Sequence, residues 1–138
     1  MLLGFDPGRD KCGIAVMSRD RQLYYHQVVE SKDAIAAIAE LQQQYPIEQI
    51  VMGNQTTSKQ WQKQLQEYWG DRLPIHLVDE RYSTLEARDR YWQMYPPQGL
   101  QRLIPQGMRL PPRPIDDLVA ILLIERYLHR LSPSQNGN

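Results

Sequence analysis

The order in which two kinds of hydrophobic pattern follow one another restricts the fold of this chain more than any other feature. Three short apolar runs come first, at residues 2–7, 13–18 and 22–30, and polar turns separate them. Such runs are typical of strands joined as hairpins. From residue 31 the apolar positions recur every three to four residues, which predicts an amphipathic helix over 32–44.

Strand-like and helix-like segments then alternate to the end of the chain. We expect strands at 47–52 and 74–79, and helices that begin near Ser58, near Ser83 and at residue 116. Connections that contain a helix join parallel strands, so the first strand and these two should be parallel and central. The sequence therefore predicts an α/β fold. Its mixed five-stranded sheet has strands 1–3 antiparallel, strands 4 and 5 parallel to strand 1, and helices on both faces.

Two capping patterns mark the starts of the middle helices. Thr57 is followed three positions later by Gln60, and Ser83 is followed three positions later by Glu86. In a capping box of this kind, each side chain accepts a hydrogen bond from a backbone N–H group that the helix itself leaves free. We therefore predict capping hydrogen bonds from both pairs.

Residues 96–114 differ from the rest of the chain. This segment is rich in Pro and Gly, contains no acidic residue, and carries Arg102, Arg109 and Arg113. Its two Pro pairs prevent a continuous helix. We interpret it as a loop that crosses a surface, and loops of this length are often functional.

Length and composition limit the remaining choices. The 138 residues allow a single domain, for which we expect the bounds 1–131, followed by a disordered tail at 132–138. A single cysteine, Cys12, excludes a disulfide scaffold and fits a reducing, cytoplasmic location. No apolar run reaches membrane-spanning length, so we expect no membrane association. The formal net charge of zero removes the simplest argument for a nucleic-acid partner.

Acidic residues stand where several of the predicted elements begin or end. Asp6 ends the first strand, Asp79 and Glu80 end the last strand, and Asp116 and Asp117 begin the last helix. Ligand sites of open α/β sheets lie beyond the carboxyl ends of the parallel strands, so these groups should meet at one edge. Carboxylates from separate elements suit Mg²⁺ or Mn²⁺. Neighbouring residues point in different directions, so we expect one acid from each pair to take part.

Each acidic residue also has an ordinary structural role open to it. Asp6 precedes Pro-Gly and could form a turn. Glu80 could pair with Arg81 or Arg88, and Asp116 could cap its own helix. The coincidence of the acids at the ends of elements favours the functional interpretation.

Glycines add weaker indications of anion binding. Gly8 and Gly13 flank the first hairpin turn, where a missing side chain would let the backbone approach a phosphate or simply turn. The stretch from Gly53 to Thr57 lies between a strand and a helix N-terminus, where free N–H groups bind anions. A plain helix cap is the structural alternative there.

Four motifs occur in a fixed order along the chain. They are Asp6-Pro-Gly-x4-Gly13-Ile-Ala-Val16, a strand that ends at Gly53, Asp79-Glu80-Arg81 followed by Ser83-Thr84-x-Glu86-Ala87, and Ile115-Asp116-x-Leu118-x-Ala120. Together they resemble the YqgF/RuvX family over residues 2–130. Members of that family are ribonuclease H-like proteins described as Holliday-junction resolvases, and they are also implicated in trimming the precursor of bacterial 16S ribosomal RNA.

The resemblance implies a ribonuclease H-like fold and an acidic triad of Asp6, Glu80 and Asp116 that binds Mg²⁺ or Mn²⁺. It implies two-metal hydrolysis of phosphodiester bonds, in which one ion activates a water molecule and the other stabilises the leaving oxygen. Arginine guanidinium groups would hold the backbone phosphates of the nucleic acid. The candidate substrate-binding residues are Gly8, Gly53, Thr57, Arg81, Arg109 and Arg113.

The sequence departs from the family pattern at three places, one of which is a loop before Asp116 that is longer and richer in Pro. Gly53-Asn54-Gln55 replaces the usual Gly-Leu-Pro-like stretch, and Arg113 stands where established resolvases of this fold carry a fourth acid. The first hypothesis is a nuclease for structured RNA, such as an rRNA precursor, or for branched DNA. The second is a non-catalytic nucleic-acid-binding or assembly protein of the same fold. The third is an actin-like or sugar-kinase-like phosphotransferase, which would need two copies of the fold. Symmetric junction cleavage would require a homodimer.

Overall fold

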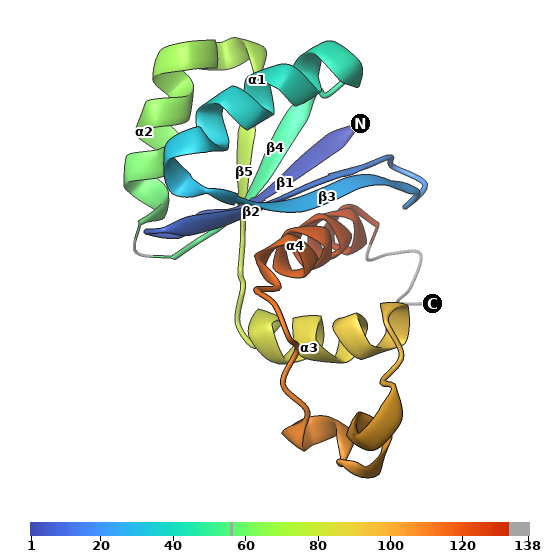
Figure 1. The fold of residues 1–138 in the computed structure, drawn as a ribbon. Coiled ribbons are helices and arrows are strands. Elements are labelled where there is room, and N and C mark those ends of the chain that lie inside the picture. The colour runs from blue at the N-terminus through green and yellow to red at the C-terminus, as the bar shows by residue number, and fades with distance from the viewer. Residues whose placement is uncertain (56, 133–138) are drawn as a thin grey trace.

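A mixed five-stranded sheet with the order β3-β2-β1-β4-β5 organises the chain (Figure 1). The structure is a computed structural model and describes residues 1–55 and 57–132. β1 is antiparallel to β2 and parallel to β4, β2 is antiparallel to β3, and β4 is parallel to β5, as predicted. The predicted central position of the last strand is wrong, because β5 lies at an edge of the sheet. The strands are β1 Leu2–Asp6, β2 Lys11–Met17, β3 Leu23–Glu30, β4 Gln49–Gly53 and β5 Ile75–Val78.

Helices cover both faces of this sheet (Figure 1). They are α1 Ala34–Gln44, α2 Ser58–Trp69, α3 Ser83–Met94 and α4 Asp116–Leu131. α1 and α2 pack over one face, and α4 packs over the other with α3 against its outer side, so the apolar residues form two cores with the sheet between them. None of the helices in the described part of the chain is long and apolar enough to cross a bilayer.

The central strand β1 is apolar from Leu2 to Phe5 because both of its faces are covered. Leu2, Leu3 and Phe5 are fully buried. Gly4 lies under α4, where an added Cβ would come within 2.4 Å of the Ala120 carbonyl oxygen. This close approach seats α4 directly on β1.

The helix starts are where we predicted them, but the capping boxes are wrong. Thr57 precedes α2 in a helical conformation and makes no side-chain capping hydrogen bond. α3 is preceded by Tyr82, which has a left-handed backbone (φ 63°), and Ser83 is already inside the helix and buried. A capping side chain reaches the first free amides from an extended backbone. The sharp turn into each helix removes that conformation.

The segment between α3 and α4 is a loop, as predicted, with two short 3-10 helices at Gly99–Leu103 and Gln106–Met108. Figure 1 shows it extending away from the sheet below α3. The predicted disordered tail at 132–138 lies outside the described residues except for Ser132. The Ser132 amide still donates to the His129 carbonyl at the end of α4.

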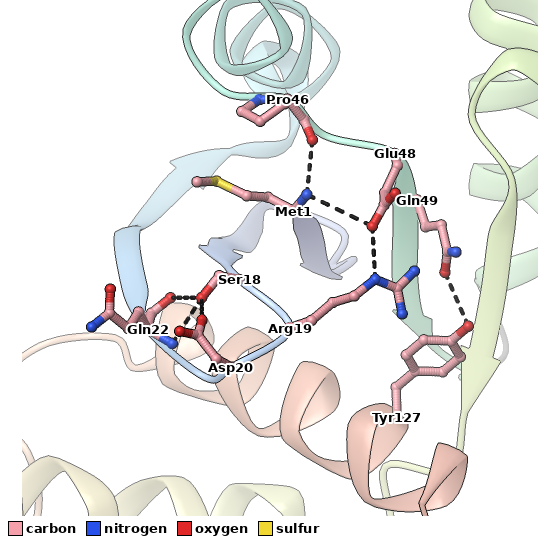
Figure 2. A network of polar contacts seen from close by, with 9 residues as sticks. All are labelled: Met1, Ser18, Arg19, Asp20, Gln22, Pro46, Glu48, Gln49 and Tyr127. Atoms are coloured by element: carbon pink, nitrogen blue, oxygen red, sulfur yellow. Dashed lines mark hydrogen bonds and ion pairs between the residues drawn. The ribbon is translucent and has the colours of Figure 1, made fainter.

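Polar contacts tie the elements together at the end of the sheet where β1 and β4 begin (Figure 2). Glu48 accepts a hydrogen bond from Arg19 at 2.9 Å and lies 3.8 Å from the Met1 ammonium group. The Tyr127 hydroxyl of α4 donates to the Gln49 side chain at 2.9 Å. These contacts lie at the opposite end of the strands from Asp6, so they fix the far end of the sheet and leave the carboxyl ends open.

Candidate active site

Asp6 ends β1 and is buried, with 6 % of its surface exposed. The strand ends there because Pro7 has no N–H group to continue the ladder. The Asp6 carboxyl group shares a hydrogen bond with Asp116. Burial, followed by repulsion from Asp116 and Glu80, raises the pKa of Asp6 to about 8. Near neutral pH the two carboxyl groups therefore share a proton.

Asp116 reaches Asp6 because α4 begins directly over β2. An added Cβ at Gly13 would lie 1.8 Å from the Asp116 carbonyl oxygen, so only glycine leaves room for this first turn. Asp116 is the first residue of the helix and not its cap, which is Ile115. Burial, and then the nearby Asp117, raise the pKa of Asp116.

Glu80 enters the site from the turn after β5, which ends at Val78. Gly53 lies beside it, and a Cβ there would come within 2.6 Å of Glu80 Oε2. The Gln55 side-chain amide donates to Oε2 at 2.7 Å, while Oε1 is buried without a hydrogen-bond partner among the described residues. Burial, with a further contribution from Asp79, raises the pKa of Glu80 to about 6.

The alternatives within each acidic pair differ in what they contact. Asp79 accepts a hydrogen bond from the Arg81 amide at 3.0 Å, which closes a local turn. Asp117 is buried and lies 2.7 Å from the His26 ring, and Arg113 donates to both of its oxygens. Asp79 and Asp117 therefore have structural partners. Glu80 and Asp116 are the members of the two pairs that act on Asp6.

The predicted phosphate-binding arginines have unequal freedom. Arg109 donates to two backbone carbonyls of its own loop and lies 5.8 Å from the Trp92 ring centroid. Arg113 holds Asp117, while the Arg81 side chain is exposed. Phosphate binding by these three side chains stays a prediction.

The remaining predicted substrate-binding positions are Gly8, at the turn after β1, and Thr57, just before α2. Gly8 allows a tight turn between β1 and β2, because an added Cβ would lie 2.1 Å from the Lys11 carbonyl oxygen. The Gly8 carbonyl accepts a hydrogen bond from the Ser31 hydroxyl at 2.9 Å. The Thr57 hydroxyl is buried without a hydrogen-bond partner among the described residues, and phosphate binding there stays a prediction. Thr56, in the same predicted anion loop, lies outside the described residues.

The chemistry of the three acids fits a divalent cation. Carboxylate oxygens are the ligands that Mg²⁺ and Mn²⁺ prefer. The unpartnered Glu80 Oε1 and the space beside Gly53 leave one acceptor free to turn toward Asp6 and Asp116. In the described residues, no three acidic, His or Cys side chains are already grouped closely enough to hold an ion.

Two residues around Glu80 were not predicted from the sequence. Gln55 holds its Oε2 atom. Arg126, from α4, donates to the Asp79 carbonyl at 2.8 Å and to Glu86 at 2.9 Å, and so fixes the turn that carries Glu80. Gln55 departs from the family pattern, and this departure could have indicated from the sequence that it has a role at the site. Arg126 gave no such indication, because its partner lies 47 residues away in the chain.

The chain is similar to known proteins along nearly its whole length. The RuvX family model, described as Holliday junction resolvase, matches residues 1–130. Proteins of Legionella pneumophila strains Lens and Philadelphia 1, each named "Putative pre-16S rRNA nuclease", are 28% identical over 143 residues, which covers 93% of this chain and 94% of theirs. The Thermus thermophilus RuvC structure aligns with a TM-score of 0.51 at 15% identity, over 95% of this chain and 96% of that one. The fold is thus ribonuclease H-like and resembles that of RuvC, and because the family model spans nearly the whole sequence, the chain belongs to the RuvX family.

Proposed function

We propose that this chain is a divalent-metal-dependent nuclease that hydrolyses phosphodiester bonds in structured nucleic acid. The observation that carries the proposal is the meeting of Asp6 and Asp116 in a shared hydrogen bond, with Glu80 close enough to raise the pKa of Asp6. Bringing three buried or half-buried acids together from separate elements lowers the stability of the fold. Groups whose pKa values are raised in this way are typical of functional sites. Their oxygens suit a hard cation.

The proposed roles follow from the contacts of each acid. Asp6 and Asp116 would hold the cation once their shared proton has left. Glu80 would be held by Gln55 through Oε2, with Oε1 turned to the cation. A bound Mg²⁺ or Mn²⁺ pair would supply an activated water and stabilise the leaving oxygen. Asp79 and Arg126 would keep the turn that carries Glu80 in place.

The first substrate to test is a precursor of 16S ribosomal RNA. The names of the Legionella pneumophila relatives, which the chain covers almost completely, support this choice. The description of the family supports a four-way DNA junction as the second choice. Symmetric junction cleavage needs two active sites, so it carries the further requirement of a homodimer.

A cleavage assay with Mg²⁺ tests the proposal. We expect cleavage by the wild-type protein, none in EDTA, and a loss of about 100-fold or more in Glu80→Gln, which removes a metal ligand without changing its size. Asp71→Asn, an exposed acid near the start of β5, is the matched control and should cleave as the wild type does. Equal rates for Glu80→Gln and the wild type would show that Glu80 takes no part.

A non-catalytic nucleic-acid-binding role is the second candidate. Its support is the formal net charge of zero and the Gly53-Asn54-Gln55 departure from the family pattern. Binding of RNA or DNA that persists in EDTA, together with no cleavage of either substrate in Mg²⁺ or Mn²⁺, would favour this role over the nuclease.

Gly53→Ala should reduce cleavage with little effect on folding. The new methyl group would overlap the Glu80 carboxylate, a side chain that can move, so Glu80 turns away from Asp6 and Asp116. We expect cleavage to fall about tenfold or more and the free energy of unfolding to change by less than about 1 kcal/mol. Gly107→Ala is the control, because a Cβ there meets nothing within 4 Å. Full activity of Gly53→Ala would contradict the proposed position of Glu80.

A further inference from the structure

A hollow of about 490 Å³ lies beside the acidic site on the α4 face of the sheet. The start of β2 contributes Lys11 to its lining, β3 contributes His26 and Val28, and the segments around α3 and α4 contribute Tyr95 and Arg113. Its volume falls within the range of small-molecule sites. Neither Asp6, Glu80 nor Asp116 lines it, so the hollow is separate from the acids.

The floor of the hollow is a paired and rigid charge cluster. Asp117 is 2 % exposed, and its Oδ2 lies 2.7 Å from His26 Nδ1. Arg113 holds both Asp117 oxygens, at 3.0 and 3.3 Å. A buried carboxylate with both oxygens engaged is stabilised in place and does not repel an approaching anion as a free one would.

One wall of the hollow is a half-exposed aromatic ring. Tyr95 is 41% exposed. The Arg113 guanidinium lies 5.8 Å from the Tyr95 ring centroid, and the Tyr91 ring lies 5.0 Å away. These contacts hold the ring in position before a ligand arrives. Pre-positioned, half-exposed aromatic rings are the surfaces on which nucleic-acid bases stack.

Lys11 connects the hollow to the acids. It is exposed at the start of β2, and within the described residues no ion pair engages its ammonium group. Lys11 and Gly13 are two residues apart on one strand and therefore point to the same face, and Gly13 contacts the backbone of Asp116. Lys11 therefore lines the hollow and belongs to the strand that lies against Asp116, the residue that meets Asp6.

We propose that this hollow binds one nucleotide of the substrate strand next to the cleaved phosphate, with its base against Tyr95 and its phosphate at Lys11. The proposal rests on the proposed function, since it names where the same nucleic acid would continue beyond the acids. The Lys11 ammonium group suits the phosphate of a nucleotide, the Tyr95 ring suits the base, and the volume of the hollow suits a group of this size. All three features lie next to the acidic site. The paired Asp117 cluster gives the pocket a fixed floor.

Binding of a fluorescent single-stranded RNA, measured by anisotropy in EDTA, tests the hollow without cleavage. We expect Tyr95→Ala to weaken binding about tenfold, since it removes a stacking surface. Tyr95→Phe keeps the ring and should bind as the wild type does. Lys11→Gln should weaken binding and lower the salt dependence by about 0.7 of a logarithmic unit per unit of log salt. Lys59→Gln, an exposed lysine of α2 on the other face of the sheet, should change neither.

The outcomes separate this proposal from the proposed nuclease function. Unchanged RNA binding by both Tyr95→Ala and Lys11→Gln overturns the hollow, whether or not the wild type cleaves in Mg²⁺. Equal weakening by Tyr95→Phe and Tyr95→Ala also overturns it, because stacking would then play no part. Loss of binding in Tyr95→Ala and Lys11→Gln supports the hollow even where no cleavage is seen. Lys11 is exposed, so Lys11→Gln should fold normally. If Tyr95→Ala fails to fold, Lys11→Gln alone still tests the proposal.

Discussion

Asp6→Asn is expected to abolish cleavage and to stabilise the metal-free protein at the same time. The Asp6 carboxyl group is buried beside two other acids, which raises its pKa to about 8. Asparagine has nearly the same shape, carries no charge, and can still donate a hydrogen bond to Asp116. The substitution therefore removes a proposed metal ligand together with the cost of a buried charge.

The stabilisation should depend on pH in a defined direction. An unfolded Asp6 loses its proton near 3.8, whereas the folded one keeps it up to a pKa of about 8. Between these values the folded state binds more protons, so the Asp6 carboxyl group lowers the free energy of unfolding as the pH rises. The asparagine side chain of the variant does not titrate and has no such dependence. We expect the variant to gain on the order of a few kcal/mol over the wild type near pH 8 and little near pH 4.

Urea unfolding in EDTA at both pH values measures this difference. Mg²⁺ should then raise the midpoint of the wild type at the higher pH, because a ligand of the folded state stabilises it, and should have little effect on Asp6→Asn. Asp71→Asn is again the matched control. A difference between Asp6→Asn and the wild type that does not grow with pH would mean that the Asp6 carboxyl group is not held among acids.

Gly13→Ala should have the largest effect on folding of any single methyl group added at a described glycine. The new Cβ would lie 1.8 Å from the Asp116 carbonyl oxygen and 2.1 Å from its carbonyl carbon. Both are backbone atoms at the start of α4, so no side-chain rotation relieves the overlap. We expect the free energy of unfolding to fall by about 3 kcal/mol or more as α4 is displaced from β2.

Displacement of α4 also separates Asp116 from Asp6, so any Gly13→Ala protein that folds should lack metal-dependent cleavage. Chemical unfolding monitored by circular dichroism measures the stability, and the cleavage assay measures the loss of metal-dependent activity. Gly107→Ala, where a Cβ meets nothing within 4 Å, should shift the free energy of unfolding by less than about 0.5 kcal/mol. A Gly13→Ala protein as stable as the wild type would show that α4 does not rest on β2 at this point.

The arrangement of the sheet could be predicted because its pattern is local. Residues 2–5 are apolar without alternation, as expected for a strand covered on both faces, and each later helix carries its own periodicity. The capping boxes failed because the backbone conformation at Thr57 and Tyr82 is set by how the chain leaves the sheet edge. That turn depends on the packing of both neighbouring elements, which a four-residue pattern does not contain.

The acids themselves could be named from the ends of elements, but the contacts that distinguish them are distant in sequence. The partner of Asp117, His26, is 91 residues away, and Gln55, which donates to Glu80, is 25 residues away. No local rule separates Asp116 from Asp117. Only the packing of α4 against β2 and β3 turns one carboxylate toward Asp6 and the other toward His26.

The end of the sheet that carries the polar network lies opposite the acids, so a covalent probe could be attached there without reaching them. The strands β1, β4 and β5 start there, and Asp71, just before β5, is exposed on that side. The one native thiol, Cys12, has no exposed surface. A dye joined through Asp71→Cys would therefore label a single site and stand at the opposite pole from the acids. Such a probe could report on RNA binding without covering either the acids or the neighbouring hollow.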